Sequence, residues 1–464
     1  MNKQLQQSVT TQLANKRIVI LGIGITGLSC ARFLHRHQIK FAVNDSRTMP
    51  ISSGDFKHQF AENTLVLGQW DKALIAQADV LIVSPGIDIT ALAISTAISK
   101  NCDVIGDIEL FCRLSDTPIL AVTGSNGKST VVSMLNYVGN ALGYRVQLGG
   151  NIGLPVLDQI DQEKVDFIVL ELSSFQLETV KSMKALAATV LNLSDDHLDR
   201  HQTIENYGAI KQSIYKNCTY ALYNRNDNAT KPNECYINSQ QLSFGSEPAQ
   251  IGSFGLAEFD GESHLMHGDK ALYTLAELPL QGIHNALNYL AVLALGKCAG
   301  WNLTAILAIL MTFKGLAHRC EVIETNDGIR WINDSKATNV GATLAAIEGL
   351  FPTLHSNKLI LIAGGDGKGA DFSPLTQALT QHVDHLITLG KDGRAIASLR
   401  LASQANKTSH VDSLSAAVSL ARTKARVGDM VLLSPACASL DMFSNYVERG
   451  VVFIKSVLVN KEIV

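Results

Sequence analysis

The chain has 464 residues, of which 17% are charged and 46% hydrophobic, and its formal net charge at pH 7 is −3. This composition is typical of a folded protein with large cores, and the length suits two to four domains of roughly 150 residues each. The small negative charge offers no general attraction to nucleic acids or acidic membranes. We therefore expect no nucleic-acid partner. We also expect no membrane insertion, because no apolar run approaches the roughly 18 residues of a membrane span.

The N-terminal segment and the cysteines indicate a cytoplasmic protein. The first sixteen residues, MNKQLQQSVTTQLANK, are polar and lack the apolar core of a secretory signal. The eight cysteines are scattered and form no C-x-x-C pair. This pattern favours reduced thiols over disulfides or a zinc site.

Three regions with different sequence patterns predict an α/β protein with three domains in series, at residues 1–106, 107–315 and 316–464. The first alternates short apolar runs, such as RIVILG and DVLIVSPG, with helical stretches. That alternation is typical of a parallel sheet with crossover helices. The third region returns to it with KLILIAGGDG and DMVLLSPACAS.

The central region begins with the same alternation and then changes. Short strands, glycines and turns from 219 to 280 indicate an antiparallel patch. Helical stretches follow near 284–299 and 303–313, and the segment KGLAHR at 314–319 is interpreted as a linker.

A first glycine loop, VILGIGITGLSC, gives G-x-G-x-x-G at Gly22, Gly24 and Gly27, and Asp45 ends the next strand. The pattern is typical of dinucleotide binding, because the helix N-terminus offers free N–H groups to a diphosphate. It does not distinguish nicotinamide from a UDP-sugar. An NAD-dependent oxidoreductase therefore stays open as an alternative, and so does a glycine turn without a ligand.

A second glycine loop, ILAVTGSNGKSTVV at 119–132, resembles a phosphate-binding loop, but Val122 stands where G-x-x-x-x-G-K-[ST] has glycine. Lys128 can still reach terminal phosphates, and Ser129 or Thr130 can place a hydroxyl on Mg²⁺. The structural alternative is a glycine turn with a solvated lysine. A nucleotide loop here does not suit a simple dehydrogenase.

Acidic residues follow two further apolar strands. Glu171 ends one strand, and Asp195, Asp196 and His197 follow another. Ligands of open α/β sheets gather at the carboxyl ends of strands, where these groups could meet a nucleotide-bound Mg²⁺. Ordinary helix capping by Ser194 and Asp195 explains the second group equally well.

Lys211 has an unusual position on a predicted helix that Thr203 caps. Tyr207, Ile214 and Tyr215 lie on the same face as Lys211, so the lysine belongs to the apolar stripe. Snorkelling, with the stem packed and the amine in water, is the interpretation that the residues alone favour. The functional alternative is a desolvated amine with a lowered pKa.

A series of motifs then identifies a resemblance. GSNGKST, GGNIGLP, LELSSFQLE, SDDHLDRH, GIHNALN, AHRCE, WINDSKATN, GGDGKGADF and SPACASLDMF follow one another along nearly the whole chain. The series resembles the Mur ligases, and SSFQLE, WINDSKATN and SPACASLD resemble their D-glutamate-adding member. The family has a shortened G-[ST]-N-G-K loop, so Val122 agrees with it. The resemblance implies Rossmann-like outer domains and a central domain like that of P-loop ATPases.

The implied activity is ATP-dependent amide ligation in cytoplasmic peptidoglycan precursor synthesis. The carboxylate of UDP-N-acetylmuramoyl-L-alanine would attack the ATP γ-phosphate, and the amine of D-glutamate would displace phosphate from the acyl phosphate. ATP would be a co-substrate, two Mg²⁺ ions the cofactors, and the enzyme a monomer. A dehydrogenase would use only the first glycine loop, and a non-catalytic nucleotide-binding module would need only the loops.

The resemblance also implies roles for residues. The catalytic residues would be Lys128, Glu171, His197 and Lys211. The ATP site would comprise Gly124, Ser125, Asn126, Gly127, Lys128, Ser129, Thr130, Asn285, Asn288, Arg319, Asp334 and Lys336. The UDP-substrate site would comprise Gly24, Ile25, Thr26, Gly27, Asp45, Ser46, Arg47, Ser84, Pro85, Gly86, Asn151, Ser173, Gln176 and His197.

Two further sets follow from the resemblance. The D-glutamate site would comprise Thr338, Lys368, Ser439, Leu440 and Tyr446. The metal ligands would be Ser129, Glu171, His197 and Lys211, the last as a carbamate. In this family the matching lysine reacts with CO₂, which requires a neutral amine, so the resemblance reverses the interpretation of Lys211.

Overall fold

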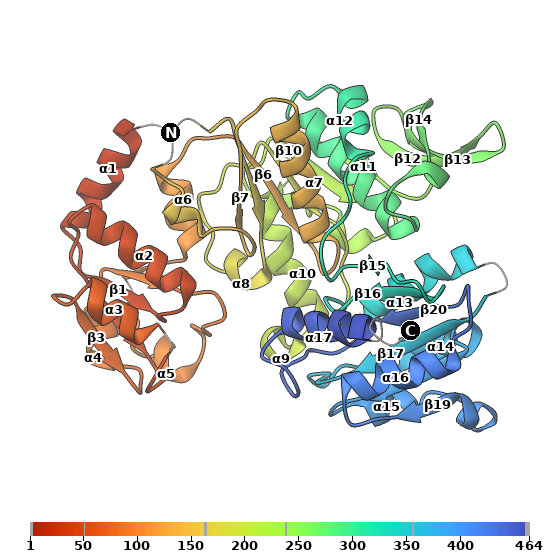
Figure 1. The fold of residues 1–464 in the computed structure, drawn as a ribbon. Helices are drawn as coiled ribbons and strands as arrows, with labels where there is room; N and C mark the ends of the chain where they lie inside the picture. The colour runs from red at the N-terminus through yellow and green to blue at the C-terminus, as the bar shows by residue number, and fades with distance from the viewer. Residues whose placement is uncertain are drawn as a thin grey trace.

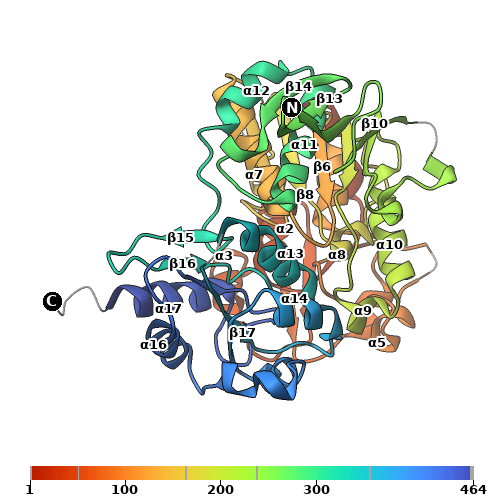
Figure 2. The same ribbon diagram turned by 90° about the vertical axis from the view of Figure 1, so that its right-hand side faces the viewer.

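The computed structural model describes residues 3–50, 52–99, 101–161, 165–236, 239–354 and 357–459. The described residues form three α/β units in series. Figure 1 shows the red N-terminal unit and the blue C-terminal unit, each adjoining the yellow and green central unit, and Figure 2 shows the same molecule turned by 90°. Among the described residues no helix is long and apolar enough to cross a membrane.

The first unit is a parallel sheet whose described strands have the order β3-β2-β1-β4-β5. Its strands are β1 (Ile18–Leu21), β2 (Phe41–Asp45), β3 (Thr64–Leu67), β4 (Val80–Val83) and β5 (Asp103–Ile105). Its helices are α1 (Lys3–Ala14), α2 (Ile25–Arg36), α3 (Ser53–Gln59), α4 (Lys72–Ala76) and α5 (Leu92–Ser95), and α6 (Asp107–Leu114) leads into the central unit.

The central unit has a parallel sheet of order β11-β10-β9-β6-β8-β7 within the described chain. Its strands are β6 (Ile119–Thr123), β7 (Val146–Gly150), β8 (Phe167–Glu171), β9 (Ala187–Val190), β10 (Tyr220–Asn224) and β11 (Gln240–Phe244). Its helices are α7 (Lys128–Ala141), α8 (Ser174–Leu177), α9 (Leu198–His201), α10 (Ile204–Gln212), α11 (Ile283–Cys298) and α12 (Leu303–Leu310).

The antiparallel patch is narrower than the predicted stretch from 219 to 280. β12 (Phe254–Phe259), β13 (Glu262–His267) and β14 (Lys270–Thr274) pair antiparallel, as a small separate sheet. β10 and β11 instead extend the large parallel sheet, because the segment between them crosses over rather than turning back as a hairpin.

The third unit has the order β15-β16-β20-β17-β18-β19 among the described residues. β15 pairs antiparallel with β16, and the pairs that follow are parallel. The strands are β15 (Glu321–Ile323), β16 (Arg330–Asn333), β17 (Leu359–Gly364), β18 (His385–Leu389), β19 (Thr408–His410) and β20 (Met430–Leu433). The helices are α13 (Val340–Leu350), α14 (Thr376–Gln381), α15 (Gly393–Ala397), α16 (Leu414–Lys424) and α17 (Tyr446–Leu458).

The predicted α/β class with mainly parallel sheets is therefore confirmed. Short 3-10 helices complete the connections, at η1 (Val156–Asp158), η2 (Ser213–Tyr215), η3 (Asn228–Thr230), η4 (Glu234–Tyr236), η5 (Leu275–Glu277), η6 (Phe351–Leu354), η7 (Ser373–Leu375) and η8 (Ala402–Lys407).

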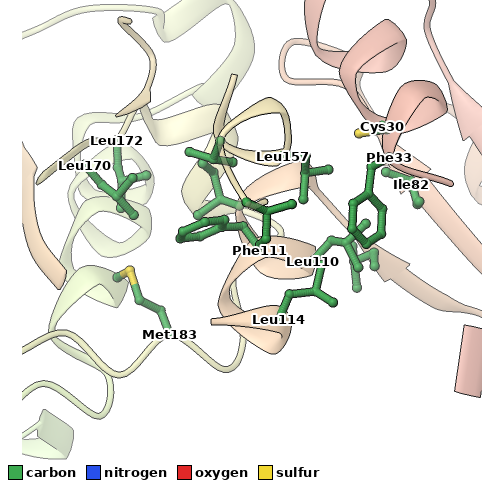
Figure 3. Close-up of a cluster of buried hydrophobic side chains, with 14 of the residues drawn as sticks. Cys30, Phe33, Ile82, Leu110, Phe111, Leu114, Leu157, Leu170, Leu172 and Met183 are labelled. Carbon is green, nitrogen blue, oxygen red and sulfur yellow. The ribbon is translucent and has the colours of Figure 1, made fainter. Parts of the chain in front are cut away.

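One hydrophobic core runs from the first unit into the central one through α6. Figure 3 shows Leu110, Phe111 and Leu114 of α6 between Phe33 of α2 and Leu170 of β8. All five side chains are at most 1% exposed. Since apolar burial is the main stabilising term in folding, α6 joins these two units into one packed body.

Polar contacts reinforce this joint. The Arg32 guanidinium of α2 forms an ion pair with Asp158 of η1, with 2.5 Å between its terminal nitrogen and the carboxylate oxygen. The buried Glu109 carboxylate accepts the backbone N–H groups of Lys181 and Ser182 at 2.7 and 2.8 Å. The first unit is thus held firmly against the central sheet.

This shared core gives a stability prediction. Phe111→Ala leaves a cavity between the two units and should lower the free energy of unfolding by about 3–5 kcal/mol. Denaturant unfolding followed by tryptophan fluorescence measures the loss. Phe259→Ala, at a ring that is 48% exposed, is the matched control and should cost no more than about 0.5 kcal/mol. A loss below about 1 kcal/mol for Phe111→Ala would contradict a continuous core.

Candidate active site

The second glycine loop lies between β6 and α7. Gly124 (φ 146°) and Gly127 (φ 83°) both have positive φ, and the helix begins at Lys128. The Lys128 ammonium donates to the carbonyls of Gly124 and Ser125 at 2.6 and 2.8 Å, so the loop curls around it. Val122 lies buried within β6, which places the loop entirely after the strand. The backbone N–H groups at the start of α7 and this lysine form a cradle for phosphate.

Glu171 ends β8 beside this loop and is 1% exposed. Its Oε1 accepts the Asn151 side-chain amide at 2.8 Å. Its Oε2 is buried and has no hydrogen-bond partner among the described residues. A buried carboxylate oxygen without a partner is costly, and a hard cation such as Mg²⁺ would satisfy it.

Lys211 is buried. The snorkelling interpretation, which the residues alone favoured and which placed the amine in water, is therefore wrong. The residue is 1% exposed, and its ammonium donates to the Thr123 hydroxyl at 3.2 Å and the Gly124 carbonyl at 3.0 Å. Burial, and next the charge of Lys128, hold the pKa of Lys211 well below its usual value. The amine lies at the carboxyl end of β6 because α10 packs there, a tertiary contact that helix periodicity cannot reveal.

His197 comes just before α9, with a left-handed backbone (φ 53°). Its ring meets the Phe175 ring edge-on at 4.9 Å between centroids. Its Nε2 lies 3.7 Å from the Asp196 carboxylate. His197 therefore faces the same region as Glu171 and Lys211.

These groups share a cavity of about 270 Å³. It brings together all the candidate catalytic and metal-ligating residues with members of the ATP, UDP-substrate and D-glutamate sets. Its lining includes Ser125, Asn126, Gly127, Lys128, Ser129, Asn151, Glu171, Ser173, Asp196, His197, Lys211, Arg319, Lys336 and Thr338.

No group of three His, Cys, Asp or Glu side chains within the described ranges is arranged to hold a metal. The four predicted metal-ligating residues, Ser129, Glu171, His197 and Lys211, all line this cavity. The oxygen of Glu171 without a partner and the hydroxyl of Ser129 suit Mg²⁺.

A second cavity, of about 510 Å³, lies between the central and third units. Gly127 of the phosphate loop and Thr130 of α7 line it together with Asn285, Asn288, Arg319, Asp334 and Lys336. Arg319 and Lys336 line both cavities. The Arg319 guanidinium donates to the Ser129 hydroxyl at 2.6 Å, across the boundary between the units. Asn288 donates to Asn285 at 3.3 Å on α11. The two cavities adjoin through the phosphate loop.

Charge in this region is unbalanced. Burial, and next the charge of Arg319, lower the pKa of Lys336 to about 8. Burial also lowers the pKa of Lys128. Burial raises the pKa of Asp334 to about 7, although the Ser434 hydroxyl and the Cys320 N–H donate to it. The cationic groups therefore lack counter-charge, which a polyphosphate would supply.

The first glycine loop lies outside both cavities. Asp45 accepts the Ile23 N–H at 2.9 Å and two bonds from the Arg47 side chain. Burial opposes its charged form, but these donors hold the pKa of Asp45 at about 2. The Ser84 hydroxyl, after β4, donates to the Gly22 carbonyl at 3.2 Å, which joins this segment to the first glycine loop.

The linings of the two cavities do not include these UDP-site candidates: Gly24, Ile25, Thr26, Gly27, Asp45, Ser46, Arg47, Ser84, Pro85 and Gly86. Gln176 is likewise outside; it closes a capping box with Ser173 on α8.

Thr338 alone of the D-glutamate candidates lines the smaller cavity, as far as the described residues go. The Tyr446 ring lies 4.1 Å from the Lys336 ammonium, so it borders the site. Lys368 and Leu440 are exposed, and Ser439 is buried. The structure does not bring these last three into the cavity.

Sequence reasoning missed several contributors. Asn192, directly after β9, accepts the Asn126 N–H at 2.8 Å and thereby shapes the phosphate loop. Ser174, Phe175 and Asn339 also line the smaller cavity. Asn192 follows a strand, and the other three lie in the motifs SSFQLE and WINDSKATN, so signals for all four were available.

A larger cavity of about 830 Å³ lies elsewhere, beside α1 and the start of β6. Leu5, Arg113 and Pro118 are among its lining residues. Its lining contains none of the candidate catalytic residues, so we assign the chemistry to the two smaller cavities.

Comparison with known families covers most of the chain. Residues 16–106 match "Mur ligase MurD-like, N-terminal domain", residues 122–296 match "Mur ligase middle domain", and residues 318–437 match "Mur ligase, glutamate ligase domain". A protein of Colwellia psychrerythraea is 53% identical over 96% of this chain and 98% of its own length. The chain belongs to the Mur ligase family.

Two proteins that are similar to this chain over nearly its full length carry the same name. The Colwellia protein is called UDP-N-acetylmuramoylalanine--D-glutamate ligase. A Pseudoalteromonas translucida protein of the same name is 43% identical over 97% of this chain and 98% of its own length.

Solved Mur ligase structures have the same fold. MurF of Thermotoga maritima, in complex with ADP, matches with a TM-score of 0.62 at 17% identity, over 99% of this chain and 100% of that one. MurC of the same organism matches with a TM-score of 0.61 at 18% identity, over 96% of this chain and 100% of that one.

Asp334 gives a prediction about pH. The pKa of this carboxyl rises from 3.8 when free to about 7 in the fold. In the window of pH between these two values, the folded protein therefore holds a proton that the unfolded chain has released. Its contribution to the free energy of unfolding therefore falls as the pH rises through the window. Asp334→Asn cannot titrate, so it should gain stability relative to the wild type between about pH 5 and about pH 7.5 in denaturant unfolding.

The matched control is Asp412→Asn, at an exposed aspartate. Its stability relative to the wild type should stay constant over the same range. A constant difference for Asp334→Asn would contradict the raised pKa.

Proposed function

We propose that this Mur ligase joins D-glutamate to UDP-N-acetylmuramoyl-L-alanine at the expense of ATP, through an acyl phosphate. The relatives at 53% and 43% identity have this activity in their names. The observation that carries the phosphoryl chemistry is the meeting of Lys128, Lys336 and Arg319 beside the Glu171 oxygen that has no hydrogen-bond partner in the described part of the chain.

The reaction has one chemical obstacle, which phosphorylation removes. A carboxylate is a poor acyl donor at neutral pH, and phosphate is a good leaving group. The protein therefore has to align carboxylate, phosphate and amine and to neutralise the phosphate charge. Lys128 on the loop and Arg319 and Lys336 from the third unit supply that charge from two sides.

Ser129, Glu171, His197 and Lys211, the last as a carbamate, would hold the two Mg²⁺ ions. Bound Mg²⁺ neutralises phosphate oxygens during their transfer. The chain prepares Lys211 for carbamate formation, because burial lowers its pKa and favours the neutral amine that reacts with CO₂.

The remaining substrate sites stay proposals. The helix N-terminus at Gly24–Gly27, with Asp45–Arg47 and Ser84–Gly86, would bind the UDP moiety. Asn151, Ser173 and Gln176 would face the muramoyl-alanine end. The D-glutamate site would comprise Thr338, Lys368, Ser439, Leu440 and Tyr446. We further propose that the enzyme acts as a monomer in the cytoplasm.

Acceptor choice tests the proposed function. Purified protein with Mg²⁺-ATP and UDP-N-acetylmuramoyl-L-alanine should release phosphate when D-glutamate is added. It should release little with L-glutamate, meso-diaminopimelate or L-lysine. Turnover with another acceptor would reject D-glutamate ligation and leave the family intact. No turnover in any mixture, with bicarbonate present, would reject the ligase.

The Lys211 carbamate predicts a graded loss of activity. Lys211→Ala should lower the rate of phosphate release by about a hundredfold or more, because it removes a proposed ligand of the Mg²⁺ ions that stabilise negative charge in the transition state. Lys211→Glu should lose less, since glutamate restores a negative charge. Lys216→Ala, at an exposed lysine just beyond α10, is the matched control and should retain activity. Full activity of Lys211→Ala would refute the role.

Domain closure gives a last prediction. We propose working domains at 1–106, 107–315 and 316–464, with 314–319 as the hinge, because polar contacts such as Arg319 to Ser129 join the central and third units. Saturation with UDP-N-acetylmuramoyl-L-alanine and a non-hydrolysable ATP analogue should lower the radius of gyration in small-angle X-ray scattering. An unchanged curve would count against closure.

A further inference from the structure

His201 stands directly behind one wall of the smaller cavity. It is the last residue of α9, and its side chain is 1% exposed. It does not belong to the lining of that cavity.

His201 contacts three side chains that do line the cavity. Its Nε2 lies 2.9 Å from the Ser174 hydroxyl oxygen. Its ring stacks on Phe175, with centroids 5.3 Å apart and an interplanar angle of 23°. It also packs against Tyr207 at 5.3 Å and 34°. One buried imidazole thus supports three neighbouring parts of the wall.

Two of those side chains support groups placed at the reaction centre. The Phe175 ring meets His197 at 4.9 Å, and the Tyr207 ring lies 4.5 Å from the Lys211 ammonium. The Tyr207 hydroxyl also lies 3.4 Å from the Ser125 hydroxyl of the phosphate loop. A shift of the His201 ring would therefore reach His197 and Lys211 together.

The other side of His201 is held as well. Its Nδ1 lies 3.6 Å from one Glu178 carboxylate oxygen, and Arg200 pairs with the other at 2.5 Å. The backbone is left-handed at both ends of α9, at His197 (φ 53°) and Gln202 (φ 68°). Such conformations cost free energy and persist where surrounding contacts hold them.

We propose that His201 is a positioning residue of the reaction, which holds His197 through Phe175 and Lys211 through Tyr207. This rests on the proposed function, in which His197 and Lys211 hold magnesium. Groups behind metal ligands fix the orientation of those ligands, and their loss costs about tenfold to a hundredfold in metal affinity or activity.

Two variants separate the contacts. His201→Gln keeps a polar group for Ser174 and loses the ring, whereas His201→Phe keeps the ring and loses the polar contact. His385→Phe is the matched control, because His385 is also buried and lies 3.1 Å from a serine hydroxyl, Ser409, in the third unit. Thermal unfolding identifies the folded variants.

His201→Gln should lower kcat by about tenfold to a hundredfold and raise the Mg²⁺ concentration for half-maximal rate by a similar factor. The KM for D-glutamate should change by less than about twofold, because the contacts of His201 described above include none of the proposed D-glutamate residues. His201→Phe should keep more activity, since stacking is retained. Values within about twofold of the wild type for folded His201→Gln would overturn the role, as would an equal loss in His385→Phe.

A binding measurement separates this role from the proposed function. Calorimetric titration with a non-hydrolysable ATP analogue, with and without Mg²⁺, needs no turnover. The gain in affinity from Mg²⁺ should shrink in both His201 variants and persist in His385→Phe. An undiminished gain would refute the positioning role. If the wild type fails to use D-glutamate, the proposed function fails, and this titration still decides about His201.

Discussion

The site depends on positive charge gathered at the carboxyl edge of the central sheet. Lys128 and Lys336 lie there with Arg319, and burial lowers the pKa of both lysines. Like charges in a medium of low permittivity repel strongly. Glu171 and Asp196 are the carboxylates in the described lining, so the arrangement is left with positive charge to neutralise. An anion with several charges, such as a triphosphate, completes it.

The parallel sheet brings this charge together. β6, β8 and β9 are neighbours that run the same way, so the phosphate loop, Glu171 and Asn192 meet at one edge. The third unit adds Arg319 and Lys336 from across a boundary that includes polar contacts, such as Asn339 to Asn126 at 3.2 Å. The first unit is joined through the apolar core around α6 instead. A polar boundary can open and close around a ligand at less cost than a dry core can be parted, so the proposed closure would move the third unit.

Much of this could be predicted from the sequence, because strands and glycine loops are local patterns. The α/β class, the loop at Lys128 and the strand end at Glu171 needed only short windows of residues. Lys211 shows the limit. Helix periodicity placed it on the apolar stripe, yet its amine is buried against Thr123, which lies 88 residues earlier in the chain. His201 shows the limit more fully, since its contact with Ser174 spans 27 residues and the motif SDDHLDRH that contains it does not reveal that contact. The antiparallel patch was drawn too wide because the crossover before β11 contains short turns that resemble hairpin turns.

The central claim is that the buried cationic side chains bind a polyphosphate. Proton uptake when a nucleotide binds tests it most directly. Lys336 has a pKa of about 8, so near that pH a fraction of its amine is neutral, and a bound triphosphate would raise the pKa again. Calorimetric titration with a non-hydrolysable ATP analogue, at about pH 8 in buffers of different ionisation enthalpy, counts the protons taken up. The account predicts net uptake by the wild type and a smaller uptake by Lys336→Met. No uptake, or an equal uptake in the variant, would contradict it.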